Sequence, residues 1–191
     1  MNIKYVIYVI LTFALFSCSG SENDGRASIV DSIEKLESVE QKKVFLEQVM
    51  QDDQAVRGSV GSELILKYGQ NSDEHYAFFE AQVKQDEINL QKVEQYLKIH
   101  GYPNRAEMGE TAANAPWTVI HHAQGYEARE RNIKSIYLAY LDGNIESFAI
   151  TLYLGRMYEM KNGKRLRMKS PYTAEDEITT LIRELNLEGL F

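Results

Sequence analysis

Six polar residues lie at or beside positions where the surrounding pattern predicts apolar ones, and their chemistry suits an active or ligand-binding site. They are two acids, two arginines, an asparagine and a histidine: Asp53, Arg57, Asp86, Asn89, His122 and Arg156. A lone charge in a protein interior costs several kcal/mol, so such residues need partners. Because two aspartates balance two arginines, we expect one network, inside the protein or lining a cleft, around His122.

Two interpretations of this network stay open. In the functional one, His122 is a general acid or base whose ring is oriented by Asp53 or Asp86. The other three residues, Arg57, Asn89 and Arg156, then bind the ligand, and the two arginines hold an anionic group on it. In the structural one, the same residues form a satisfied buried network that fixes how the helices align. Clustered ionisable groups occur in both settings.

Neither a metal site nor a cofactor site is predicted. His121 and His122 are adjacent, but neighbouring side chains on a helix point about 100° apart and do not easily chelate one ion. The chain has no HExxH motif, no GxSxG motif and no glycine-rich phosphate loop.

The segment that must position His122 is TAANAPWTVIHHAQGY, residues 111–126, which carries no Asp, Glu, Lys or Arg. In an acidic chain, so uncharged a stretch predicts a central helix buried on nearly all faces. Pro116 is compatible with this helix if it lies in the first turn.

Amphipathic helices are predicted on both sides of this segment. Asp53 and Arg57 share the stripe of Leu46, Val49 and Met50 in a helical region 28–60. Asp86 interrupts the apolar stripe of a long helix 72–100, for which Asn71 is the expected N-cap. Further helices are expected at 63–68, 127–141 and 173–187.

Two segments near the C-terminus carry strand signals. Residues 146–154 fit either a helix or a strand, and Arg156 continues the stripe of Ile145, Phe148 and Leu152 if the segment is helical. Residues 157–168 predict a β-hairpin around Asn162-Gly163. We therefore expect a single, mainly α domain over 28–191, with six or seven helices and one small β-hairpin.

The N-terminus resembles a bacterial lipoprotein signal. Lys4 precedes an apolar run of signal-peptide length, and Leu15-Phe16-Ser17-Cys18 resembles a lipobox. We expect a signal peptide at 1–17, lipidation of Cys18 and a flexible polar tether at 18–27. An ordinary cleaved signal peptide and an anchor helix are the alternatives.

The net charge of the chain and its expected lipid anchor restrict the partners that it can bind. A formal net charge of −7 argues against nucleic-acid binding. The expected partners are a membrane, reached through the lipid on Cys18, and an unknown small ligand or envelope protein. The expected location is the bacterial cell envelope, on the periplasmic or the cell-surface side.

Over residues 46–168 the chain resembles a bacterial family of uncharacterised domains whose function is unknown. That family shows Asp-Gln-x-x-Arg, then Asp-x-x-Asn before Gly-Trp-Pro, then Gln-His-Ala-Asp, and later Asp-Arg before a hairpin. The matching residues here are Asp53-Gln54 with Arg57, Asp86 with Asn89, Gly101-Tyr102-Pro103, His122-Ala123 and Arg156. Tyr102, His121, Gln124 and Gly155 depart from the pattern, as does most of the later hairpin motif.

These departures shape the expected function. If the family site is catalytic, this chain lacks part of it, so the resemblance favours a ligand-binding or protein-interaction module. The alternative is a hydrolase-like enzyme built on His122, Asp53 and Asp86.

Overall fold

The computed structural model describes residues 22–190, with side chains from Ala27 onward, and confirms the mainly α class. The helices are α1 (Glu22–Glu34), α2 (Val39–Ala55), α3 (Val60–Tyr68), α4 (Asp73–His100), α5 (Arg105–His122), α6 (Tyr126–Leu141), α7 (Ser147–Asn162) and α8 (Ala174–Leu185). A short 3-10 turn, η1 (Glu188–Leu190), follows. The predicted signal peptide and Cys18 lie outside the described residues. Helix α1 begins at Glu22, inside the segment 18–27 that the sequence predicts as a tether.

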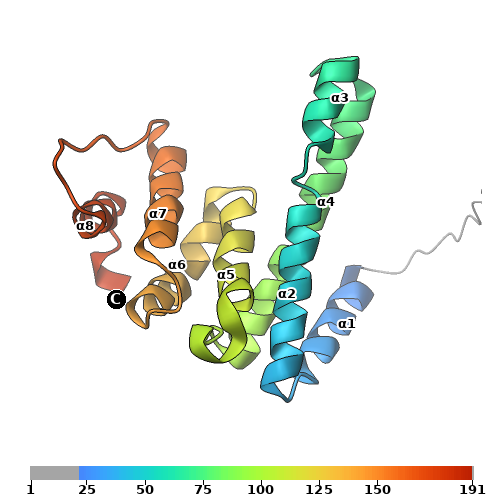
Figure 1. Ribbon diagram of the computed structural model, residues 1–191, viewed down its shortest axis with the longest axis horizontal. Coiled ribbons are helices and arrows are strands. Elements are labelled where there is room, and N and C mark those ends of the chain that lie inside the picture. Colours follow the sequence, from blue (N-terminus) through green and yellow to red (C-terminus); the bar gives the residue numbers. More distant parts are fainter. Residues whose placement is uncertain (1–21, 191) are drawn as a thin grey trace, which may run out of the picture.

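Helix α5 occupies the centre of the arrangement (Figure 1), where it packs against α2, α4, α6 and α7. One apolar cluster joins it to α6, α7 and α8 through residues such as Ile120, Ile136 and Leu154. A second cluster joins it to α1, α2 and α4 through Ala112 and Tyr96. The prediction of a helix buried on nearly all faces is confirmed, because α5 belongs to both cores.

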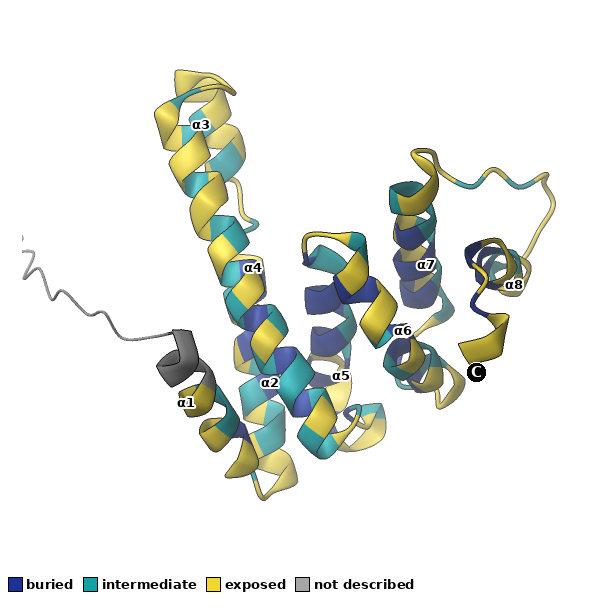
Figure 2. Ribbon diagram, turned by 180° about the vertical axis from the view of Figure 1, so that it is seen from behind, coloured by how far each residue is buried: buried dark blue, intermediate teal, exposed yellow. Residues whose placement is uncertain are grey.

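Exposure differs sharply between the helices. Figure 2 shows buried residues concentrated along α5 and α7, whereas α3 and the adjoining part of α4 are exposed or intermediate. Each helix of the described range is too short or too polar to cross a bilayer.

Helix α5 is not one continuous helix. Asn104 caps its start by accepting hydrogen bonds from the backbone N–H groups of Ala106 and Glu107. Gly109 then breaks it with φ 82° and ψ 173°, a conformation open almost only to glycine. Pro116 therefore lies inside the second part rather than in a first turn, which corrects the prediction.

The helices that meet α5 begin and end differently from expectation. The region 28–60 is two helices, separated where Ser38 forms a capping box with Gln41 at the start of α2. The N-cap of α4 is Ser72 rather than Asn71, because the Ser72 hydroxyl accepts from the backbone N–H of His75.

The predicted β-hairpin at 157–168 is wrong. Helix α7 covers the ambiguous segment and continues to Asn162, and Gly163 ends it in the left-handed conformation with φ 68°. Asn-Gly favours a left-handed backbone, and that same property suits the C-terminus of a helix as well as a hairpin turn. The following chain up to α8 lacks regular structure, and Leu166 in it packs against the larger core.

Candidate functional site

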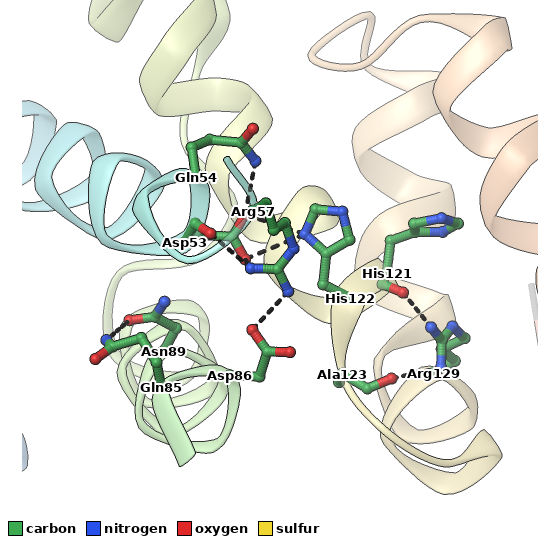
Figure 3. Close-up of polar contacts among 10 residues, drawn as sticks. All are labelled: Asp53, Gln54, Arg57, Gln85, Asp86, Asn89, His121, His122, Ala123 and Arg129. Carbon is green, nitrogen blue, oxygen red and sulfur yellow. Dashed lines mark hydrogen bonds and ion pairs between the residues drawn. The ribbon is translucent and has the colours of Figure 1, made fainter. Parts of the chain in front are cut away.

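A buried ion-pair network joins the end of α2 to the middle of α4 (Figure 3). Asp53 is completely buried in the last turn of α2, and Asp86 is buried on α4. Arg57 bridges them. Its Nη1 lies 3.1 Å from Asp53 Oδ1 and donates to the Asp53 backbone carbonyl at 2.6 Å, while its Nη2 donates to Asp86 Oδ1 at 2.5 Å.

His122 joins this network from the C-terminal turn of α5. Its Nδ1 lies 3.1 and 3.0 Å from the two carboxylate oxygens of Asp53, and Gln54 donates to the same carboxylate at 2.7 Å. A carboxylate only accepts hydrogen bonds, so Nδ1 carries the hydrogen and Asp53 fixes the orientation of the ring. The other ring nitrogen faces away from Asp53 (Figure 3). Asp53, Arg57, Asp86 and His122 thus lie together.

Asn89 lies beside the network but is not hydrogen-bonded to it. Its side chain is fully buried on α4, and its Oδ1 accepts from Gln85 at 2.9 Å. Its Nδ2 is buried and has no hydrogen-bond partner in the described part of the chain. A direct ligand contact by Asn89 therefore has no support from the geometry.

Arg156 lies apart from the network. Ile145, which precedes α7, is buried, but within α7 the stripe faces outward, since Phe148 is 69% and Leu152 41% exposed. Helix α7 instead buries the face of Tyr153 and Met157. The Nη1 of Arg156 pairs with Glu159 at 3.1 Å. The predicted inward position of Arg156 is wrong, and it does not share a ligand with Arg57, which is held by two aspartates.

Arg156 and His122 nevertheless line one pocket. The pocket has a volume of about 260 Å³ and lies at the end of α5, with Gln124 and Arg129 also in its wall. A second hollow of about 430 Å³ adjoins it and shares Arg156 and His121. His122 thus has one side on the buried network and another on a solvent-accessible pocket.

Arg129 belongs to this site although the sequence analysis missed it. Its side chain is 3% exposed, and it donates to the backbone carbonyls of Ala123 and Gly125, each at 2.9 Å, and to that of His121. Burial lowers the pKa of Arg129, and the nearby charge of Arg156 lowers it further. Position 129 is one turn before Ile133 on the inward stripe of α6, so the face analysis that found Asp53 would have found it.

His121 packs between Trp117 and His122, with ring centroids 6.1 and 5.8 Å away. Burial lowers its pKa to about 4, and the charges of Arg129, His122 and Arg156 act in the same direction. His121 is therefore a neutral ring at pH 7, and its Nδ1 has no hydrogen-bond partner among residues 22–190.

The chemistry available at the pocket is that of an oriented imidazole beside a guanidinium. Such a pair can bind an anionic group, and the imidazole can also accept or donate a proton. The described residues include no group of three or more His, Cys, Asp or Glu side chains arranged to hold a metal ion.

Comparison with protein families, curated proteins and solved structures finds no match to this chain. The family resemblance therefore stays a prediction that rests on the motifs themselves.

Arg57→Leu is expected to lower the free energy of unfolding by about 3 kcal/mol, because it leaves Asp53 and Asp86 buried without their cation. In a domain of this size the Tm should fall by about 6 to 12 °C. The matched control is Arg131→Leu, which removes a more exposed pair with Glu94 and should cost less than about 1 kcal/mol. Equal Tm values for the two variants would contradict a structural role for the network.

The lowered pKa of His121 predicts a loss of stability in acid. Between pH 6.5 and about 4 the unfolded chain binds a proton at His121 and the folded chain does not, so the free energy of unfolding falls as the pH falls. We expect this ring to lower the free energy of unfolding by about 2 kcal/mol, a value discounted for its partial exposure to water. Denaturant titrations of wild type and His121→Phe at pH 7 and pH 4 measure this contribution, because the variant should lose less stability in acid than wild type. An equal loss of unfolding free energy in both proteins would contradict the prediction.

Proposed function

We propose that the protein is a lipid-anchored protein of the bacterial cell envelope whose helical domain binds a small ligand in the pocket beside His122. The anchor is inferred from the lipobox-like sequence that ends at Cys18. The observation that carries the binding function is the placement of His122, held by Asp53 through one ring nitrogen while its side chain also lines the pocket.

Partial exposure of His122 favours a site over a purely structural network. A network that served stability alone would be most stable with all its members buried and paired. Here Asp53 and Asp86 are buried, but the side chain of His122 is 28% exposed. Arg57 and Asp53 therefore act as a rigid support, and His122 presents the polar surface that a ligand can contact.

A hydrolase is the second candidate, because a buried aspartate bonded to a histidine is an arrangement that supports a general base. The pocket lining offers no hydroxyl or thiol side chain within the described residues. Hydrolysis there would consequently need a water molecule as the nucleophile. Gln124 and Gly155, which stand where the resemblance implies aspartates, further favour binding.

Replacement of His122 tests the binding function. Full-length protein extracted in detergent is expected to carry a small molecule in native mass spectrometry, and His122→Ala is expected to lose it because the oriented ring is gone. His75→Ala is the control, since His75 lies near the start of α4 and not in the pocket lining. Equal retention by all three proteins, or no bound molecule in any of them, counts against this function. Turnover of a p-nitrophenyl ester that depends on His122 and not on His75 would favour the hydrolase.

Mass spectrometry of the intact protein tests the proposed lipid anchor separately. The intact mass of the mature protein should correspond to a chain that begins at Cys18 and carries the added mass of a diacylglyceryl group, because a lipobox cysteine is modified on its thiol. Cys18→Ser removes the thiol and should abolish the added mass. A wild-type chain without this mass would refute lipidation at Cys18.

A further inference from the structure

Positive charge collects around the 260 Å³ pocket without acidic residues in its wall. This charge is that of Arg129 and Arg156, which line the pocket together with His121 and His122, and none of the lining residues in the described chain is Asp or Glu. Asp53, the nearest carboxylate on the network side of His122, is already paired with Arg57. The charges at this pocket are therefore not neutralised from within the pocket.

Arg129 is the more unusual of the two arginines. A guanidinium buried in a protein is normally paired with a carboxylate, but Arg129 makes no ion pair with any described acidic residue and donates only to backbone carbonyls. Two of those carbonyls, of His121 and Ala123, lie at the C-terminal end of α5, and the third belongs to Gly125, the N-cap residue of α6. The C-terminus of a helix carries partial negative charge and repels anions. Arg129 neutralises that end and makes it compatible with an anion beside it.

Arg156 supplies the exposed donor. Its only carboxylate partner among the described side chains is Glu159, which also pairs with Arg165 at 3.5 Å, so one acid serves two guanidiniums. The side chain of Arg156 is 49% exposed. A guanidinium with unused N–H groups at the mouth of a pocket matches the paired oxygens of phosphate or carboxylate groups.

The electrostatic environment of His121 agrees with this picture. The pKa of this ring is lowered by burial first, and then by Arg129, His122 and Arg156, which lie close to it. A neutral His121 beside the pocket leaves the binding of an anion to Arg156 and His122.

We propose that the ligand of this pocket carries a small oxyanion, of the phosphate or carboxylate class, held by Arg156 and by the doubly protonated ring of His122, which donates from Nε2, with Arg129 as a positioning residue behind it. This inference rests on the proposed binding function and adds the chemical class of the ligand. The volume of about 260 Å³ admits an anionic group with a short organic stem. The anion can belong to a soluble metabolite or to a lipid headgroup.

Titration calorimetry of the full-length protein in detergent, with inorganic phosphate as the probe at constant ionic strength, tests the proposal. Wild type should bind about one phosphate per chain. Arg156→Gln should weaken binding about tenfold or more, since it removes charge-assisted hydrogen bonds. Arg165→Gln is the matched control, because Arg165 shares Glu159 but does not line this pocket, and it should stay within about twofold of wild type.

A second probe, the soluble short-chain lipid dihexanoyl phosphatidic acid, identifies the source of the anion. Binding tighter than that of phosphate, and dependent on Arg156, supports a lipid headgroup, whereas equal or weaker binding supports a soluble anion. No binding of either probe, unchanged binding by Arg156→Gln, or equal weakening by Arg165→Gln would overturn the proposal.

These outcomes separate the ligand class from the binding function itself. A co-purified molecule that is neutral or cationic, is lost from His122→Ala and is not displaced by phosphate overturns the oxyanion class and leaves the binding function in place. Phosphate binding that depends on Arg156, without any ligand lost from His122→Ala, supports the oxyanion site and contradicts the proposed function.

Discussion

The guanidinium of Arg57 between two buried aspartates is the interaction on which the rest of the site depends. It ties the end of α2 to the middle of α4 and balances one of the two negative charges buried there. Two buried carboxylates without a cation would repel each other and lack solvation. With Arg57 in place, Asp53 keeps the geometry in which its carboxylate also holds His122.

Helix α5 connects this ion-pair network to the pocket. Both of its sides are packed, one against α2 and α4 and the other against α6 and α7, and both apolar clusters include residues of α5. The backbone carbonyls at its C-terminal end accept hydrogen bonds from Arg129 of α6. The same helix end thus separates the buried ion-pair network from the pocket that Arg129 and Arg156 line.

Much of this architecture was accessible from periodicity. Asp53, Arg57 and Asp86 were placed inward by the 3.6-residue pattern of long amphipathic helices, and the structure buries both aspartates and most of Arg57. The same reasoning failed for Arg156, because α7 is apolar on several sides and its stripe of Phe148 and Leu152 faces solvent. It passed over Arg129 because an arginine in a charged helix resembles a surface residue. Asn162-Gly163 indicated a left-handed turn, and only the length of α7 decided that it ends a helix.

The sequence by itself determined the helical class, the uncharged central helix and the inward faces of α2 and α4, because these follow from local periodicity and composition. The tertiary structure alone decided which charges meet. Helix periodicity tells which face a residue occupies but not which neighbouring helix lies opposite, and an ion pair depends on the distance between two such faces. Hence only the packed helices show that Arg57 is held by two aspartates, whereas Arg129 and Arg156 line the pocket at the end of α5.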